Sequence, residues 1–234
     1  MTRRVARLAL GTLICLVFAA LVALGVWQLE RRSWKLALIA QVEQRLNAPP
    51  VAAPGPDRWP DIGDRDSYTR VVAQGRYRAG ADTFVQATTA LGGGYWVLSP
   101  LDTGAFTVLV NRGFVPPEMR GKAPPPKGPV RVEGLLRVTE PEGAFLRSND
   151  PASGRWYSRD VAAIAAEHRL SNVAPYFIDA SGPKTGFPRG GLTVVRFRNN
   201  HLGYALTWFG LAAGLLVMVF IVRRMGKGAA ADTE

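Results

Sequence analysis

Two long apolar runs stand near the ends of the chain. Leu8–Leu29 and Leu202–Val222 extend over 22 and 21 residues without a charged side chain. At about 1.5 Å rise per helical residue, each run reaches roughly 30 Å, the thickness of the hydrocarbon core of a bilayer. A cleavable signal peptide is the alternative for the first run, but this run is too long and no small-x-small cleavage site follows it. The pattern predicts two membrane-spanning helices.

Between these runs, short β-type stretches alternate with turn residues. A proline-rich connector occupies residues 48–60, and glycine clusters such as residues 92–94 separate the later stretches. Seven stretches have the composition and spacing of antiparallel strands. They are Tyr68–Tyr77, Thr83–Thr89, Tyr95–Leu101, Phe106–Phe114, Val130–Val138, Tyr176–Asp179 and Leu192–Phe197. One helical pattern covers Arg159–Arg169, with Ser158 as the expected N-cap. The prediction is an α+β, mainly antiparallel β domain, barrel- or sandwich-like, with one helix.

The predicted order of the chain follows from the two spans. Two spans place both termini on one side of the membrane, and arginines in both tails favour the cytoplasm, although comparable charge lies on the inner flanks. The predicted segments are a cytoplasmic tail (1–7), a membrane helix (8–29), an extracytoplasmic mainly-β domain (30–201), a second membrane helix (202–222) and a cytoplasmic tail (223–234).

Charge and cysteine usage narrow the class of partner. The formal net charge is +11, which by itself suggests nucleic acid. Most of the basic excess, however, lies beside the two spans, as in Arg3, Arg4, Arg223 and Arg224, so we expect membrane lipid as the partner and no nucleic acid. The single cysteine, Cys15, lies in the first span, which predicts no disulfide framework and no thiol metal site in the soluble domain.

The middle segment carries no recognised catalytic pattern. It has no nucleophile elbow, HExxH, phosphate loop or dinucleotide fingerprint. Its one histidine, His168, falls late in the predicted helix, where an imidazole can face solvent near the negative end of the helix dipole. We therefore expect a protein that is not an enzyme, and a His168→Ala variant that keeps its function.

The second apolar run begins with a histidine, which is costly in lipid and often functional there. At 100° per residue, Trp208, Ala205 and Ala212 fall on the side of His201 and Tyr204 flanks it. The two alanines leave space beneath them for a flat cofactor. The opposite side carries small residues, namely Gly203, Thr207, Gly210 and Gly214. A small-residue face lets another helix approach closely. We expect it to pack on Gly11, Cys15, Ala19 and Ala23 of the first span, leaving His201 and Trp208 outward.

An imidazole beside flat aromatic surface is compatible with a porphyrin, because neutral imidazole binds haem iron and cations can meet the propionates. The candidate cations are Arg196, Arg198, Arg31, Arg32 and Lys35. In the first helix, Trp27, Arg31 and Trp34 share a face and can form a cation–π stack. The alternative for both groups is an interfacial belt of aromatic and basic anchors.

The chain resembles the Surfeit locus protein 1 family of cytochrome c oxidase assembly factors, called Shy-type in yeast, as a bacterial member. The matching pieces, in family order, are "GVWQLERRSWK" at 25–35, "LVNRGFVP" at 109–116, "RWYSRDVAAIA" at 155–165, "PYFIDA" at 175–180 and "HLGYALTWFGLA" at 201–212. Phe114 departs from the tryptophan usual in the family at the end of "NRGW".

The resemblance implies a factor of the bacterial inner (plasma) membrane that has a periplasmic domain and promotes maturation of oxidase subunit I. It also implies transient binding of haem a, received from haem A synthase, with His201 as the matching histidine and metal ligand. The residues expected around the haem are Tyr204, Trp208, Arg196, Arg198, Trp27, Arg31 and Arg32. The alternative function is a membrane scaffold that stabilises a subunit I intermediate without carrying haem.

Overall fold

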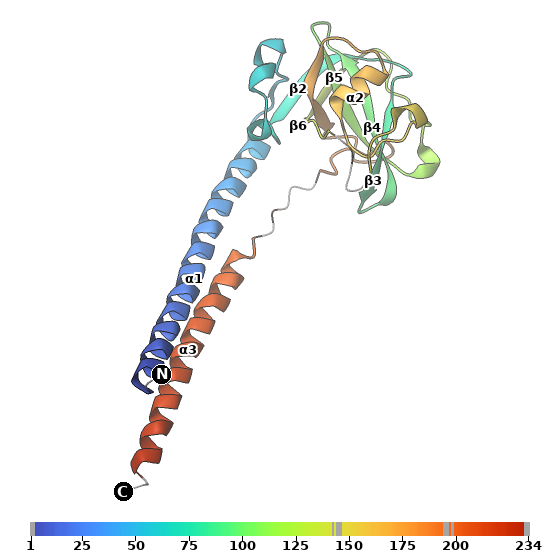
Figure 1. Ribbon diagram of the computed structural model, residues 1–234. Helices are drawn as coiled ribbons and strands as arrows, with labels where there is room; N and C mark the ends of the chain where they lie inside the picture. Colours follow the sequence, from blue (N-terminus) through green and yellow to red (C-terminus); the bar gives the residue numbers. More distant parts are fainter. Residues whose placement is uncertain (1–2, 142, 144–146, 194–196, 198, 232–234) are drawn as a thin grey trace. The chain divides into compact units, whose positions relative to one another are not determined.

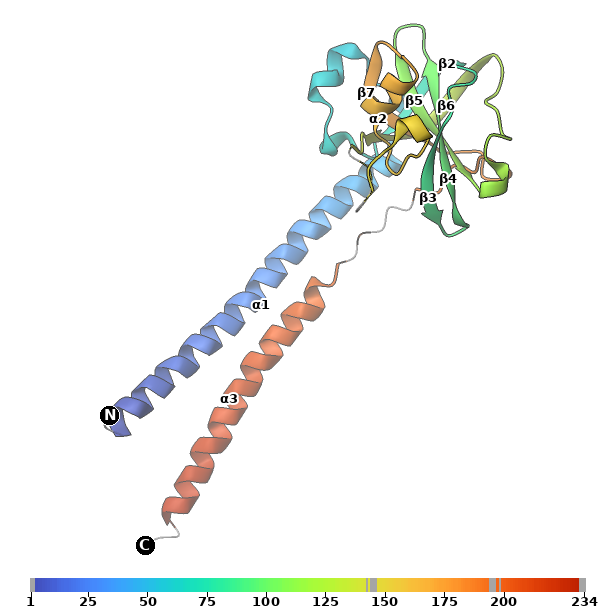
Figure 2. The same ribbon diagram turned by 45° about the vertical axis from the view of Figure 1, so that its right-hand side comes forward.

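The computed structural model describes residues 3–141, 143, 147–193, 197 and 199–231. Contacts divide the chain into two compact units. One unit contains residues 1–41 together with residues 196–234, and the other contains Val42–Val195. Figure 1 shows the first unit as two long helices and the second as a β domain, which Figure 2 shows from another side.

The first unit consists of α1 (Arg3–Asn47) and α3 (His201–Ala231). Both helices are long and apolar enough to cross a membrane, and only 6% and 11% of the residues in their most apolar windows are buried. A core helix of a soluble protein would be mostly buried, so these helices have the character of membrane spans. The α1 helix continues well past Leu29, because neither glycine nor proline interrupts the chain until Pro49.

The β domain is built on one seven-stranded sheet with the order β1-β2-β6-β7-β5-β4-β3. The strands are β1 (Val51–Ala52), β2 (Arg70–Tyr77), β3 (Thr83–Thr89), β4 (Gly92–Asp102), β5 (Thr107–Val115), β6 (Pro129–Val138) and β7 (Val173–Ala180). An additional pairing of β2 with β4, through Arg76 with Asp102 and Tyr77 with Leu101, closes five of these strands into a ring. The domain is therefore a barrel and not a sandwich.

Short helical segments connect the strands of the β domain. The 3-10 turns are η1 (Pro56–Asp61), η2 (Asp64–Asp66), η3 (Pro117–Met119) and η4 (Pro151–Ser153). The predicted helix is present as α2 (Val161–Glu167). Its N-cap is Asp160, whose carboxylate accepts from the Ala163 N–H at 3.1 Å. The expected cap, Ser158, is buried instead and accepts hydrogen bonds from Gly143 N–H and the Asn149 amide.

Three details of the sheet differ from the prediction. The pairs β1–β2 and β5–β7 are parallel, so the sheet is mixed. Glycines 92–94 are part of β4 and pair with Thr89, Thr88 and Ala87 of β3, so they do not separate strands. Gly94 is required because a Cβ there would lie 2.6 Å from the Phe114 ring. In the expected strand 192–197, residues 192, 193 and 197 are not in a strand, and residues 194–196 lie outside the described residues.

Two groups of buried side chains fill the barrel and the space under α2. The first gathers around Tyr176 and Ile178 of β7, with Leu101 and Val110 from neighbouring strands. The second places Ile164 of α2 against Phe177, Leu109, Leu98, Val85 and Trp156. Strand β7 contributes to both groups through alternate residues, because successive side chains of a strand point to opposite faces.

Candidate functional site

The contact between α1 and α3 is formed by the face of α3 that carries His201. Ala205 and Ala212 on this face are 1% and 4% exposed. Phe209 fills the notch at Gly25 of α1 so closely that a Cβ on Gly25 would lie 2.6 Å from its ring. Small residues are thus used here for close helix approach, on α3 as alanines and on α1 as a glycine.

The glycine face of α3 points away from α1. Cβ atoms built on Gly203, Gly210 and Gly214 would meet nothing within 4 Å among the described residues. The line predicted on α1 is open as well, since Cys15 is exposed and Gly11 has no close neighbour in the described part of the chain. The predicted packing is therefore wrong. The observed face places the ring of Phe209 in the notch at Gly25 and pairs two polar side chains that would otherwise lie unbonded.

Those two polar side chains are His201 and Gln28. The Nδ1 atom of His201 lies 2.8 Å from the amide oxygen of Gln28. An amide oxygen only accepts, so in the neutral imidazole this contact pairs with the tautomer that has its proton on Nδ1 and its lone pair on Nε2. This is the tautomer that a metal ligand bound through Nε2 requires. Sequence reasoning missed Gln28, although a polar side chain within an apolar span is a signal of function.

The other predicted ligand residues are distributed around the helix pair. Tyr204 and Trp27 are 56% and 52% exposed, Trp208 and Arg32 are half-buried, and Arg31 is exposed. The Arg31 guanidinium stacks at 4.4 Å on Trp34, which is one side of the predicted Trp–Arg–Trp stack. The Lys35 ammonium lies 5.4 Å from the Phe197 ring. Arg196 and Arg198 lie outside the described residues.

The space beneath the alanines, where a porphyrin was expected to lie, is occupied by α1. Ala205 and Ala212 are buried and Phe209 fills the notch at Gly25, so a porphyrin does not fit between the helices. The donor set still suits an iron porphyrin approaching from outside the pair. It offers an imidazole fixed in the correct tautomer, exposed aromatic surface at Tyr204 and Trp27, and guanidinium groups one to two turns away on α1.

In the β domain, residues of three resemblance motifs converge on Asp179. This carboxylate is 4% exposed and accepts hydrogen bonds from Asn111 at 2.7 Å and from Arg159 at 3.2 Å. Arg137 and Thr193 add bonds at 3.2 and 3.0 Å. Burial lowers the pKa of Arg159, but the carboxylates of Asp179 and Glu140 outweigh this effect and raise it. The network ties β5, β6 and β7 to the segment before α2.

The arginine of the "NRGF" motif has a different structural role. Arg112 is 7% exposed and donates to the carbonyl oxygens of Ala123 and Pro124 at 3.0 and 2.9 Å. It holds the proline-rich loop before β6 against the barrel. Its guanidinium also lies 5.7 Å from the ring of Tyr77, and burial raises the pKa of that phenol to about 12.

His168 does not simply face solvent, so this expectation is wrong. It is half-buried at the end of α2, and its Nε2 lies 2.8 Å from the hydroxyl of Thr83, which is 3% exposed. Burial lowers the pKa of His168. Among the described residues, no group of three or more His, Cys, Asp or Glu side chains could hold a metal ion.

The fold defines a class of protein, one in which a closed β barrel lies in the sequence between two helices able to span a membrane. The SURF1 family model matches residues 15–213. The chain is 35% identical over 239 residues to Surfeit locus protein 1 of Mus musculus, covering 90% of this chain and 75% of that protein. It is 36% identical over 224 residues to Surfeit locus protein 1 of Homo sapiens, with 84% and 72% covered. A SURF1-like protein of Monosiga brevicollis is 35% identical over 227 residues, with 87% and 83% covered. The chain belongs to the SURF1 family.

Proposed function

We propose that this protein is an assembly factor for haem-copper cytochrome c oxidase that binds haem a transiently and assists its delivery into subunit I. The observation that carries the proposal is the His201–Gln28 pair, in which the amide oxygen holds Nδ1 and leaves Nε2 able to bind iron. A hydrogen-bond acceptor on the nitrogen that does not bind the metal fixes the ring orientation and the tautomer of a ligating histidine. The proposal assigns the protein no catalytic step.

The residues near His201 have separate roles in this proposal. His201 would hold the iron through Nε2, and the exposed ring of Tyr204 and the half-buried ring of Trp208 would supply aromatic surface to the haem. Arg31, Arg32, Arg196 and Arg198 supply cations for the propionates, and Trp27 adds apolar surface. The haem supplies iron coordination and a flat apolar surface. The protein side chains hold it at the edge of the helix pair, because Phe209 closes the space between the helices.

The proposed partners are subunit I of cytochrome c oxidase, haem A synthase and the lipid of the bacterial inner membrane. Both termini lie in the cytoplasm and the barrel in the periplasm. This orientation can be tested with a Cys15→Ser background, because Cys15 is the single cysteine of the chain. A cysteine placed at the exposed position of Lys127 should react with a membrane-impermeant maleimide in spheroplasts. Labelling that occurs only after lysis would overturn this orientation.

The haem proposal is tested by the absorption spectrum of the full chain purified from cells that make haem a and from cells that lack haem a synthesis. The wild-type protein should show haem a absorption only in the first case. His201→Ala should remove or shift it. Gln28→Leu should lower haem affinity about 10-fold or more, the usual effect of losing the hydrogen bond that orients a ligating histidine. His168→Ala is the matched control, since His168 is the other histidine of the chain.

Retention of haem a at normal stoichiometry with an unchanged spectrum in His201→Ala would reject the ligand assignment. The alternative scaffold function would then be preferred, since subunit I could still be stabilised without haem on this protein. Assembled oxidase, measured in the same strains, separates these cases. The scaffold function predicts normal oxidase in His201→Ala cells, whereas haem delivery predicts a reduced amount.

A further inference from the structure

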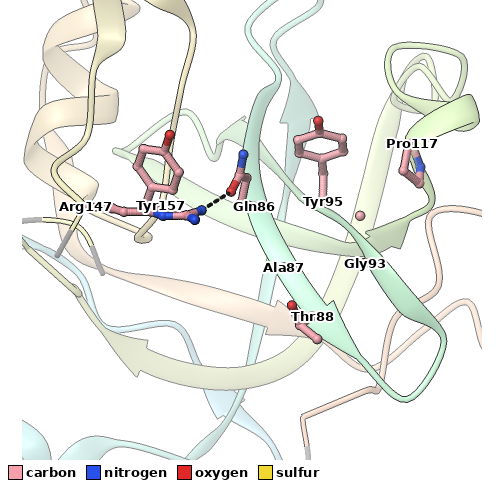
Figure 3. A pocket seen from close by; sticks show the side chains of 9 residues that line it. Gln86, Ala87, Thr88, Gly93, Tyr95, Pro117, Arg147 and Tyr157 are labelled. Carbon is pink, nitrogen blue, oxygen red and sulfur yellow. Dashed lines mark hydrogen bonds between the residues drawn. The ribbon is translucent and has the colours of Figure 1, made fainter. Parts of the chain in front are cut away.

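One face of the β3–β4 hairpin is hollowed into a trough of about 590 Å³ (Figure 3). Gln86 lies directly opposite Tyr95 and Thr88 directly opposite Gly93, so these residues share that face. Arg147 and Tyr157 stand on one side of the hairpin and Pro117 on the other. This volume lies in the usual range of ligand pockets. All of these residues belong to the β domain, and the haem proposal uses none of them.

The floor of the trough is Gly93, where neither the backbone conformation nor the packing requires a glycine. A Cβ on Gly94 would meet the carbonyl oxygen of Val115 at 2.4 Å, and Gly92 has a φ of +100° that favours glycine. Gly93 has neither constraint, since a Cβ there would meet nothing within 4 Å among the described residues. Glycine weakens a strand by roughly 0.5–1 kcal/mol. Within a strand it often marks a place where a ligand or another backbone approaches closely.

The trough is lined by one guanidinium group, that of Arg147, and Arg120 lies near it over a lining residue; each has an aromatic ring as a neighbour. The Arg147 guanidinium lies 5.5 Å from the Tyr157 ring and makes a long 3.4 Å contact with the Gln86 amide oxygen. Arg120 lies over Tyr95 at 4.8 Å. In the described part of the chain, neither arginine has a salt bridge to a carboxylate. Stacked guanidinium groups keep their edge N–H donors for a carboxylate ligand.

The backbone beside the trough offers pairing to an extended chain. Strand β3 is the last strand of the sheet, and the Gln86 N–H donates to the carbonyl oxygen of Trp156 at 2.8 Å, away from β4. Since backbone groups of a strand alternate in direction, those of Thr88 also point away from β4. A short segment of this chain thus already pairs with the edge at Gln86, and another extended segment can continue along Thr88.

We infer that this trough is a docking site for an extended acidic segment of a partner protein. The segment pairs with the β3 edge beside Thr88, reaches toward Gly93 with a side chain and places a carboxylate on Arg147. This inference uses the proposed function only in expecting a protein partner, and it does not depend on haem at His201. Charge complementarity and the open backbone edge favour a peptide over a small anion, which would use the arginines but not the glycine floor.

The test uses the full-length protein in detergent and two fluorescent ten-residue peptides as probes, one with alternating Glu and Val and one with Gln replacing each Glu. Fluorescence anisotropy should show at least 10-fold tighter binding of the acidic peptide. Arg147→Gln and Gly93→Val should each weaken this binding about 10-fold or more. Arg131→Gln is the matched control, because it removes the same charge from an exposed site on β6. A preserved melting temperature in Gly93→Val would show that the strand is intact.

Equal binding of the two peptides, or unchanged binding in Gly93→Val and Arg147→Gln, would overturn the inference. Inorganic phosphate that displaces the acidic peptide and binds as tightly as the peptide, tested up to 10 mM, would also overturn the inference, because the trough would then be a simple anion site. Binding of phosphatidylglycerol vesicles through Arg147 in place of the peptide would reject it in favour of a lipid surface. The haem a spectrum of Gly93→Val should equal that of the wild type. The peptide-binding result can therefore be interpreted even if the haem proposal fails.

Discussion

Replacing Asp179 by alanine should be the most destabilising single change in the polar network of the barrel. The carboxylate accepts hydrogen bonds from Asn111, Arg137, Arg159 and Thr193 at 2.7–3.2 Å and is 4% exposed. The variant would leave two arginines, whose side chains are only 18% and 14% exposed, without this partner. Removing one partner of a buried ion pair costs about 3–5 kcal/mol.

The lower end of that range is expected because part of the network survives. Glu140 still accepts from Arg159 at 2.6 and 2.9 Å and from Arg137 at 3.2 Å, so neither arginine loses every carboxylate. A loss of about 3 kcal/mol lowers the melting temperature of a domain of this size by roughly 6–12 °C. Asp179→Asn keeps the shape and some of the hydrogen bonds, so its loss should be smaller than that of Asp179→Ala.

The assay is thermal unfolding of the full chain in detergent, followed by tryptophan fluorescence, because Trp156 is buried in the core under α2 and Trp96 packs against that core. Arg155→Ala is the control. It breaks the exposed pair with Asp150, whose contribution to stability should be too small to resolve. A decrease of less than 2 °C in Asp179→Ala, similar to that of Arg155→Ala, would refute the reasoning that the buried carboxylate stabilises the barrel.

Three further results are expected. Gly25→Leu should disrupt the helix pair, because its Cβ would lie 2.6 Å from the Phe209 ring, and lower the aggregation temperature in detergent, whereas Gly210→Leu should not; equal effects would contradict the observed packing. His168→Ala should lose about 1 kcal/mol at pH 8 with the Thr83 bond. The pKa of His168 is lowered from its ordinary 6.5, so wild-type stability should fall as the pH decreases below 6.5, and the variant should show a flatter profile. Burial raises the pKa of Tyr77 from 10 to about 12, so urea unfolding should show stability that is lost between pH 10 and 12, and Tyr77→Phe should reduce that loss; an unchanged alkaline profile would count against a buried phenol.

Local patterns predicted the elements well and their long-range partners poorly. The run Thr83–Thr89 coincides with β3, because β-branched residues at alternate positions specify a strand without reference to the remainder of the chain. The parallel pairing of β5 with β7 and the closure of β2 on β4 join segments far apart in sequence. Alternation of polar and apolar residues says which face is buried but does not say which strand lies alongside.

The predicted site was only partly accessible to sequence reasoning. His201 was found because histidine is rare in an apolar span, and the same argument applies to Gln28, which was overlooked. The rotation of α3 was wrong because the small-residue rule considered only how small the side chains on a face are. It did not weigh how one large ring, Phe209, fits a single notch at Gly25. The N-cap of α2 was misplaced for a similar reason, since Ser158 and Asp160 are both good caps and tertiary bonds to Ser158 decided between them.

The order of strands in the ring has a consequence for biosynthesis. Among the described strands, β7 is the last to leave the ribosome, yet it lies in the middle of the sheet, between β6 and β5. Until Val173–Ala180 has been synthesised, β5 and β6 each expose an edge, and the core around Tyr176 and Phe177 lacks its centre. The barrel therefore cannot complete while earlier parts emerge, and a nascent chain that stalls before β7 presents two unpaired edges at which other chains can aggregate.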